Sequence, residues 1–126
     1  MERRIRRLMS IKDPEARRRY NMEYHKKYYE KHKGAYKERA KAFNKSRRKW
    51  NREFISRVKS MRGCIDCGIN NPIVLDFDHV TGQKLGNISD MVNNACGLAK
   101  IKKEIRKCEV RCANCHRLRT QKRRKS

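Results

Sequence analysis

Apolar and polar positions recur with helical spacing over the first half of the chain. A helix is expected to begin at Asp13, a candidate N-cap that is followed by Pro14 at the first helical position and by Glu15, whose carboxylate suits the helix dipole. Gly34 is a candidate break or bend in this helix. Beyond it, apolar side chains fall at steps of three, four or seven, at Ala40, Phe43, Trp50, Phe54, Val58 and Met61. This face is expected to pack on the domain that follows, and base stacking by Trp50 or the tyrosines is the alternative.

A strand pattern opens the second half of the chain, in the segment IVLDFDHV. Leu75 and Phe77 alternate there with Asp76 and Asp78. Because successive side chains of a strand point to opposite faces, the pattern predicts one buried face, both carboxylates on the other face, and His79 at the strand's end.

The remaining patterns complete a mixed fold. They predict a loop, two helices, a short strand and a final basic helix, over residues 81–87, 88–94, 98–107, 108–112 and 114–124. The fold class predicted is therefore α+β, with a basic helical arm over residues 1–60 and a second domain over residues 61–126.

Basic residues dominate the composition, since 36 Lys and Arg face 13 Asp and Glu, for a net charge of +23. Residues 1–60 hold 22 basic and 7 acidic side chains, and residues 61–126 hold 14 and 6. So large an excess suits a polyanion, so DNA is the expected partner. Candidate phosphate contacts in the arm are Arg47, Arg48 and Lys49. A solvated or disordered basic segment is the alternative.

The size of the chain leaves little for a large core, because 37% of its 126 residues are hydrophobic and 39% are charged. A metal or a crosslink is therefore expected to support the fold. The N-terminal segment has no apolar region typical of a signal peptide, and no run is apolar enough to span a membrane, so a cytoplasmic setting is expected. In that setting, paired cysteines indicate metal ligands rather than disulfides.

Two CxxC pairs supply the metal ligands, Cys64 with Cys67 and Cys112 with Cys115. This spacing lets each pair contribute two thiolates to one tetrahedral structural zinc, and merely buried or redox-active cysteines are the alternative. Gly63 and Gly68 flank the first pair and allow the tight turn that it needs. Two cysteines remain: Cys96, and Cys108, which is close enough in sequence to compete as a ligand but is expected to be a small buried side chain.

A closed four-thiolate site has no open coordination position, so any hydrolytic chemistry must use other residues. Asp78 and His79 end the predicted strand, and His116 follows Cys115 at the start of the last helix. The zinc is expected to bring the three together, where a carboxylate and an imidazole could hold a divalent cation and a second imidazole could act as a base. Taken singly, each has an ordinary alternative: a solvated carboxylate, a hydrogen-bonded histidine and a residue at a helix start.

The segments CIDCG, VLDFDHV and CEVRCANCHRLRT, in this order over residues 61–121, resemble the HNH endonucleases, specifically the zinc-containing subgroup common among bacteriophage proteins. The resemblance implies a small ββα-metal (His-Me finger) core. It also implies that His79 is the general base and that Asp78 and His116 hold the catalytic cation. Arg117 and Arg119 are then candidates to hold flanking phosphates.

The function that this resemblance implies is divalent-cation-dependent hydrolysis of DNA, by nicking or double-strand cutting, with 5′-phosphate and 3′-hydroxyl ends. Mg²⁺, Mn²⁺ and Ni²⁺ are the candidate cations, and the host cytoplasm is the expected location of a phage-encoded protein. Two alternatives remain: a non-catalytic zinc ribbon that binds nucleic acid, and an accessory protein that works with a phage packaging partner.

One position departs from the family pattern. The middle Asn of HNH proteins braces the loop after the Asp-His strand, and Lys107 stands in its place here. Asn87, Asn93 and Asn94 are candidates to take over this bracing, whereas Asn114 lies inside the second cysteine pair.

Overall fold

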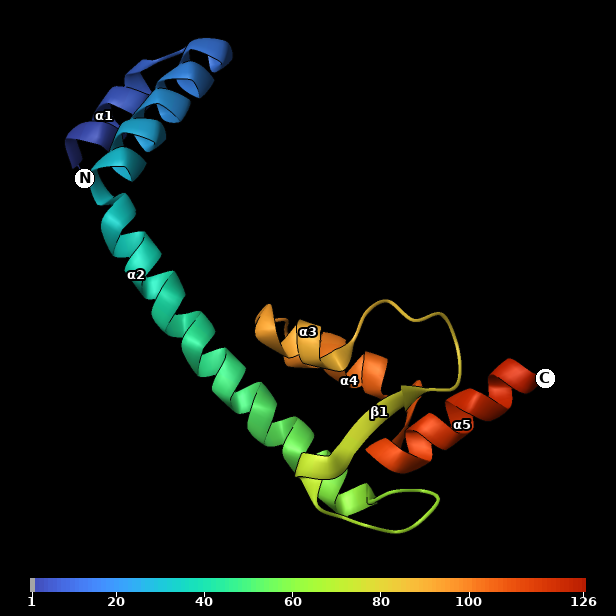
Figure 1. Cartoon of the computed structure of the whole chain (residues 1–126). Helices are drawn as coiled ribbons and strands as arrows, with labels where there is room; N and C mark the ends of the chain where they lie inside the picture. Colours follow the sequence, from blue (N-terminus) through green and yellow to red (C-terminus); the bar gives the residue numbers. More distant parts are fainter. Residues whose placement is uncertain (1) are drawn as a thin grey trace. The chain divides into compact units, whose positions relative to one another are not determined.

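The computed structural model describes residues 2–126 (Figure 1) and divides into two compact units. The first, called the N-terminal unit below, reaches to Lys41, and the second, the C-terminal unit, spans Ala42–Ser126. Both include part of one long helix, α2 (Pro14–Arg62). Among the helices of residues 2–126, none has a stretch both long and apolar enough to cross a lipid bilayer.

The N-terminal unit is a helical hairpin in which α1 (Glu2–Ser10) lies beside the start of α2 (Figure 1). Asp13 is the N-cap of α2, as predicted, because its carboxylate accepts hydrogen bonds from the backbone N–H groups of Glu15 at 3.1 Å and Ala16 at 3.2 Å. The two helices meet through a cation–π contact, with the Arg4 guanidinium 4.1 Å from the centroid of the Tyr24 ring.

Of the two possibilities at Gly34, a break does not form, because α2 is continuous through this residue. A single glycine costs a helix interior only about 1 kcal/mol relative to alanine, which a long helix tolerates.

The C-terminal unit contains a two-stranded antiparallel sheet of β1 (Leu75–His79) and β2 (Cys108–Cys112). The register pairs Leu75 with Cys112 and His79 with Cys108. The strand begins later than the sequence pattern suggested, because Pro72–Val74 form a 3₁₀ turn, η1, capped by the Asn71 side chain. The pairing places one end of β1 beside the second cysteine pair.

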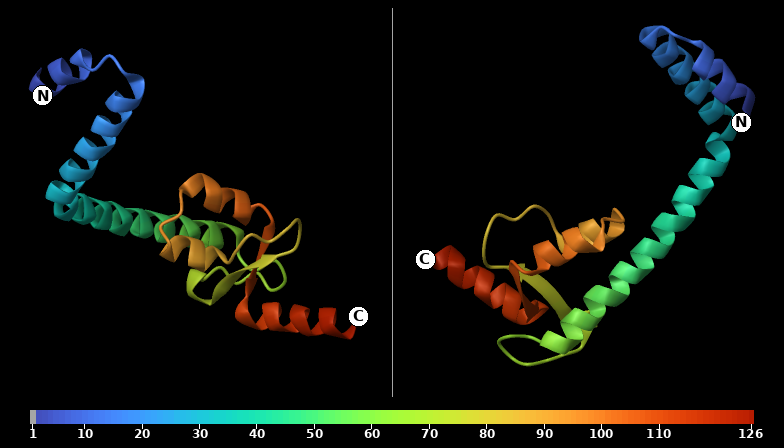
Figure 2. Two further views of the ribbon diagram at one scale, coloured as in Figure 1. Left: turned by 90° about the horizontal axis from the view of Figure 1, so that it is seen from above. Right: turned by 180° about the vertical axis from the view of Figure 1, so that it is seen from behind.

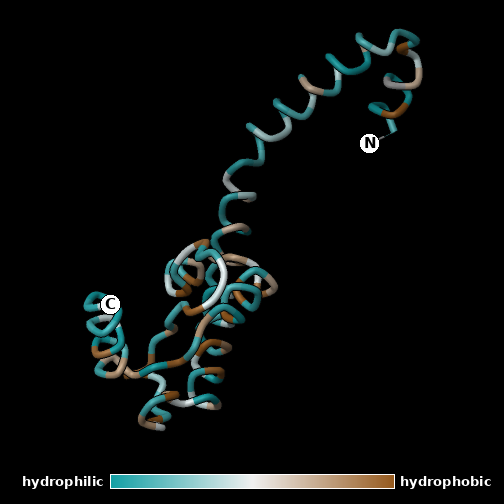
Figure 3. The backbone as a smooth tube through the Cα atoms, turned by 90° about the vertical axis from the view of Figure 1, so that its right-hand side faces the viewer, coloured by the Kyte–Doolittle hydropathy of each residue, from teal (hydrophilic) through white to brown (hydrophobic). Residues whose placement is uncertain are grey.

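Three helices complete this unit: α3 (Ile88–Asn93), α4 (Leu98–Ile105) and α5 (Ala113–Lys125). Within the unit, α3 and α4 lie on one side of the two strands and α5 on the other (Figures 1 and 2). The hydrophobic segments gather in this unit, whereas the N-terminal unit is largely hydrophilic (Figure 3). The structure is therefore α+β, as predicted, with a small two-stranded sheet.

The largest core cluster lies under the last turns of α2. It consists of five buried residues of α3 and α4, Ile88, Met91, Val92, Ile101 and Ile105, with partly buried Phe54, Ile55 and Val58 of α2 packed against them. Phe54 and Val58 were expected in this contact. Trp50 and Met61 were expected there too, but they are 72% and 86% exposed.

The apolar face of α2 is thus rotated relative to the predicted one, because two polar side chains belong to it. Asn51 is buried and donates to the carbonyl of Cys96 at 3.0 Å, and Arg47 donates to the carbonyl of Ala95 at 3.2 Å. These carbonyls follow the end of α3, so polar contacts fix the helix position where hydrophobic periodicity predicted apolar ones.

Candidate functional site

The first cysteine pair lies in a tight turn after α2. Gly63 and Gly68 adopt positive φ angles of 65° and 77°, which glycine allows without strain. The turn closes through a hydrogen bond from the N–H of Gly68 to the carbonyl of Cys64 at 2.9 Å, and it is tied to β2 by one from Ile65 to Val110 at 2.9 Å. The two flanking glycines therefore have the role that the sequence predicted for them.

The second pair joins β2 to α5. Cys112 ends the strand and is the N-cap of the helix, where its sulfur accepts a hydrogen bond from the backbone N–H of Cys115 at 3.4 Å. The pairing of Leu75 with Cys112 places this junction at the start of β1. A metal held here would fix both the strands and the helix.

The four sulfur atoms of Cys64, Cys67, Cys112 and Cys115 all lie within 4.8 Å of one another. Tetrahedral zinc with four bonds of 2.3 Å separates its sulfur ligands by about 3.8 Å, and the sulfur atoms of Cys67 and Cys112 are 3.7 Å apart. All four cysteines are free thiols. The cluster could therefore hold a structural metal such as zinc.

The electrostatics of the cluster fit a cation site. Burial raises the pKa of Cys64, but backbone hydrogen bonds at Cys112, Cys67 and Asp66 outweigh burial and lower the pKa to about 6. The hydrogen bond with Cys112 raises the pKa of Cys115 to about 12. Without a metal the four thiols share little negative charge, and a dication is what allows all of them to ionise.

The two other cysteines lie outside the cluster. Cys108 is buried in the sheet and donates a weak hydrogen bond to the carbonyl of Glu104 at 3.4 Å, and burial raises its pKa to about 11. Cys96 packs against the main core cluster. The expectation that Cys108 is a small buried side chain is confirmed.

A cleft of about 230 Å³ lies close to the thiol cluster and contains both candidate histidines. His79 of β1 and His116 of α5 line it, together with Asp76 and Lys59. The ring of His116 lies between two carboxylates, with Nδ1 3.6 Å from Asp76 Oδ2 and Nε2 3.6 Å from Asp78 Oδ1. The structure thus brings the end of β1 and the start of α5 together.

Asp78 differs from the sequence expectation, because its side chain is only 3% exposed while that of Asp76 is 52% exposed. The strand pattern predicted both carboxylates on an open face. Arginines explain the burial: Arg111 Nη1 and Arg123 Nη2 donate to Asp78 Oδ2 at 2.8 and 3.1 Å, and Arg119 Nε lies 3.7 Å away. The carboxylate that was expected to hold a cation is surrounded by guanidinium groups in this structure.

His79 contacts a residue that the sequence analysis missed. Its Nε2 lies 2.9 Å from Glu104 Oε1, and the Glu104 side chain is 1% exposed. The signal in the sequence was a carboxylate on the apolar face of α4, three residues after Ile101 and next to Ile105, both of which are buried.

Glu104 is held by two further donors. Lys107 Nζ donates to Oε2 at 2.8 Å, and the backbone N–H of Leu85 donates to Oε1 at 3.0 Å. The hydrogen bond from Lys107 lowers the pKa of Glu104, burial opposes it, and the contacts with Leu85 and His79 add to the lowering, so the pKa is about 2. Glu104 is therefore an ionised carboxylate in the interior.

The loop after β1 is braced by the residue that replaces the expected asparagine. The carbonyl of Lys107 accepts from the N–H groups of Val80 and Thr81 at 2.9 and 3.2 Å, and its Nζ donates to the carbonyl of Gln83 at 2.8 Å. Lys107 and Glu104 thus hold the loop that Asn87, Asn93 and Asn94 were expected to brace.

These three asparagines have other contacts. The Asn87 side chain donates to Asp90, the oxygens of Asn93 accept from arginines of α2, and Asn94 ends α3. Asn114 is exposed in the first turn of α5.

The predicted phosphate contacts fall into two groups. Arg47 and Arg48 are half-buried and donate to backbone carbonyls at the end of α3, Arg48 to Asn93 at 2.8 Å, while Lys49 is exposed. On α5, Arg117 is exposed, whereas Arg119 is half-buried and contacts Glu109 at 3.2 Å. Arg117 and Lys49 are thus the more accessible members of the set.

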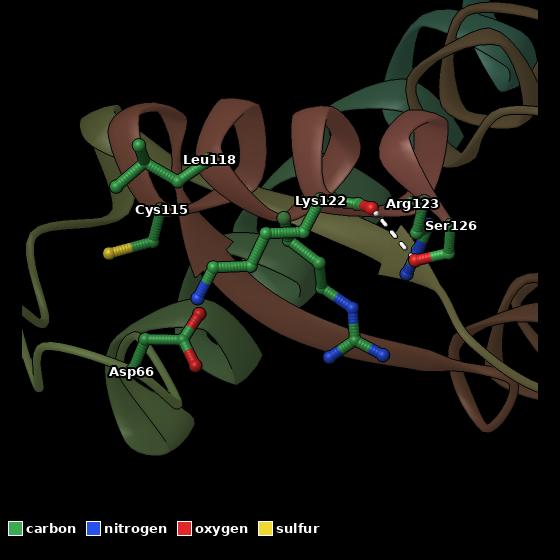
Figure 4. Close-up of a pocket in the computed structure, with 7 residues that line it drawn as sticks. Asp66, Cys115, Leu118, Lys122, Arg123 and Ser126 are labelled. Carbon is green, nitrogen blue, oxygen red and sulfur yellow. Dashed lines mark hydrogen bonds between the residues drawn. The ribbon is translucent and has the colours of Figure 1, made fainter.

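A second hollow, of about 530 Å³, lies between α5 and the first cysteine turn (Figure 4). Lys122 and Arg123 come from the helix and Asp66 from the turn on the opposite side. Arg119 also lines it, so two of the three arginines around Asp78, Arg119 and Arg123, reach solvent here.

Comparison with models of protein families, with curated proteins and with solved structures gives no match to this chain. The geometry and chemistry of the site are therefore what indicate a function for this chain.

Proposed function

We propose that this protein is a divalent-cation-dependent endonuclease that hydrolyses DNA phosphodiester bonds on a ββα-metal core formed by β1, β2 and α5. The observation that carries the proposal is the position of His116, whose Nε2 lies 3.6 Å from Asp78 Oδ1 while His79 lines the same cleft. Two ligands of an octahedral Mg²⁺ at about 2.1 Å lie about 3 Å apart, so a small movement would let both atoms bind one cation.

In the proposed reaction, His79 takes a proton from the attacking water, and the water oxygen bonds to phosphorus as the bond to the 3′-oxygen breaks. The released 3′-oxygen takes a proton from solvent, so the products carry 5′-phosphate and 3′-hydroxyl ends. A cation bound by Asp78 and His116 would stabilise the added negative charge on the phosphate and the leaving oxygen. The open side of the cleft at His79 and His116 gives the substrate access to both groups.

The arginines at Asp78 have to be accommodated in this reaction. Arg119 and Arg123 are both partly exposed, at 37% and 45% of their side chains, so they can turn toward another anion. DNA phosphates would supply that anion, and Asp78 would then be released for the cation. Arg111 is buried and would stay as the fixed partner of the carboxylate.

The charge of the chain supports DNA as the substrate. The net charge is +23, and α5 carries six basic and no acidic residues beside the cleft. Each phosphate that these side chains neutralise releases counterions, which favours binding to a polyanion. We place Arg117 and Lys49 among the side chains that contact phosphates, because both are exposed.

One observation favours a second function. The Asp78 carboxylate already has strong hydrogen-bond donors, and a site in which they never leave would not bind a catalytic cation. The protein would then be a metal-containing module that binds nucleic acid without cutting it, alone or beside a phage packaging partner.

Plasmid cleavage distinguishes the two functions. Purified wild-type protein, His79→Ala and the control His32→Ala are incubated with supercoiled plasmid in EDTA and in Mg²⁺, Mn²⁺ or Ni²⁺. We expect cation-dependent nicking or linearisation by the wild type and the control, and a rate lower by about 10²- to 10⁴-fold for His79→Ala. Equal cutting by His79→Ala would rule out the base, and binding without cutting under every cation would favour the non-catalytic module.

A further inference from the structure

The buried carboxylate of Glu104 contacts Nε2 of His79, and Glu104 is not one of the residues that line the cleft. We propose that Glu104 is a positioning residue for His79: it fixes the ring with the proton on Nε2, so that Nδ1 is the basic nitrogen turned to the substrate. The role of His79 as a base belongs to the proposed function, and the assignment of Glu104 adds to it.

The direction of the hydrogen bond follows from the chemistry of the two partners. An ionised carboxylate can only accept, and Glu104 is ionised because Lys107 Nζ lies 2.8 Å from Oε2 and the Leu85 N–H donates to Oε1 at 3.0 Å. The 2.9 Å contact between His79 Nε2 and Oε1 therefore requires a proton on Nε2. In a neutral ring this leaves Nδ1 unprotonated and able to accept a proton from water.

The carboxylate is also held rigidly enough to orient the ring. Its side chain is 1% exposed, and its oxygens accept from Lys107, which follows the end of α4, and from Leu85 in the loop after β1. His79 is 14% exposed and lines the cleft, so one ring edge meets Glu104 while another side reaches the cleft. Among residues 2–126, Nε2 is the only ring nitrogen of His79 with a hydrogen bond to protein.

A role in bracing alone does not account for this arrangement. The loop is already held by three bonds to Lys107, two through its carbonyl and one through its Nζ. A glutamine at position 104 could still accept from Leu85, but it would carry no charge to select one form of the imidazole. The two roles therefore predict different results for Glu104→Gln.

The first test reads the tautomer directly, without any cleavage assay. Long-range ¹H–¹⁵N spectra of the full-length, zinc-loaded protein are recorded at about pH 8, above the usual histidine pKa of about 6.5. The signals of His79 are assigned by their loss in His79→Ala. We expect the Nε2–H tautomer in the wild type and a mixture in Glu104→Gln. An Nδ1–H tautomer in the wild type would overturn the proposal even if the protein cuts DNA.

The second test measures catalysis. Glu104→Gln is expected to lower kcat by about 10- to 100-fold with little change in KM, the range typical of partners that orient a functional histidine. Glu53→Gln, an exposed glutamate of α2 in the same unit, is the matched control and should keep the wild-type kcat. Full activity in a folded Glu104→Gln protein would contradict the positioning role.

The two proposals can fail separately. A wild-type protein that does not cut DNA but shows the Nε2–H tautomer contradicts the nuclease and supports the contact to Glu104. If Glu104→Gln does not fold, Lys107→Met tests the same network, because loss of the cation that faces Glu104 should weaken its selection of the Nε2–H form. An unchanged tautomer population in a folded Lys107→Met protein would then show that groups other than Glu104 set the tautomer of His79.

Discussion

The ring of His116 lies between two carboxylates of very different exposure, Asp76 at 52% and Asp78 at 3%. An exposed carboxylate is hydrated and mobile, and it loses side-chain entropy when it binds a cation. A buried carboxylate that Arg111 already orients loses less side-chain entropy on binding a cation, provided that the cation replaces positive charge that is already present. If the proposed cation binds here, we expect Asp78 to be its fixed carboxylate ligand and Asp76 to orient His116 through Nδ1.

At the same scale, Glu104 makes the stability of the fold depend on pH. Its pKa is about 2 in the folded protein, below the ordinary value of 4.5, mainly because of the hydrogen bond from Lys107. A lowered pKa stabilises the folded state at pH values above about 4.5, and the contribution is lost as the pH falls toward 2. We expect the wild type to unfold more readily from about pH 5 downward, with this residue contributing to the loss.

The measurement is urea unfolding of the wild type and Glu104→Gln between pH 3 and pH 7. The difference in free energy of unfolding should be largest near neutral pH and should shrink as the pH falls, since the glutamine has no charge to lose. Release of metal from the cysteines affects both proteins and cancels in the comparison. A difference that stays constant across this range would contradict the assignment.

At the scale of elements, α5 carries both the arginines that contact Asp78 and the histidine of the proposed cation site. Arg119 and Arg123 are four residues apart, so they lie on the same face, and both reach Asp78. The first turn of the same helix carries Cys115 and His116. Under the proposed function, binding of a cation at His116 and binding of phosphate by the two arginines would be coupled through the carboxylate of Asp78.

This coupling predicts that Arg123→Met binds Mn²⁺ more tightly than the wild type in the absence of DNA. Arg123 is 45% exposed, so its pairing with Asp78 is worth at most about 1 kcal/mol and the expected gain in affinity is about two- to fivefold. Titration calorimetry with Mn²⁺ measures it. Lys125→Met, which removes an exposed charge from the same helix, is the matched control and should change the affinity less. Equal affinities for Arg123→Met and the wild type would mean that Arg123 does not compete with the cation.

The elements also show what could be predicted from sequence. The strand with Asp78 and His79, the two CxxC turns and the basic last helix follow from local patterns, because spacing alone places those residues. The burial of Asp78 and the role of Glu104 depend on residues more than 20 positions away, Arg111 and His79, and no local pattern contains them. The docking face of α2 was misplaced for the same reason, since Asn51 is buried through a bond to Cys96.

At the scale of the whole molecule, the core of the C-terminal unit is small, so we expect its stability to depend on a metal at the cysteine cluster. Its buried hydrophobic residues form two clusters, and the smaller one contains two of the four cysteines, Cys64 and Cys112, beside Leu75 and Val110. A metal at the cysteines would thus connect the end of α2, the sheet and α5 at one point. Binding of the metal to such a site is largely folding free energy, on the order of 10 kcal/mol or more for zinc.

Cys64→Ser should therefore unfold the sheet and release α5, because it removes a ligand that is 3% exposed. We expect the purified variant to hold no zinc by atomic absorption and to lose the dispersed ¹H–¹⁵N signals of β1 and β2. Circular dichroism is not a criterion for loss of the sheet, since the long helix α2 keeps much of its signal when the sheet unfolds.

Cys96→Ser provides the matched control, because Cys96 is half-buried against the core but lies outside the cluster. It should keep one zinc per chain and a dispersed spectrum. If Cys64→Ser is well folded without zinc, the cluster is not what supports this unit, and the placement of His116 beside Asp78 must then come from the arginine contacts of α5 alone. Cleavage by such a variant would show that the cleft of His79 and His116 works without the thiol cluster. Joint loss of zinc, of spectral dispersion and of cleavage is the result that we expect from the neighbouring positions of Cys115 and His116 on α5.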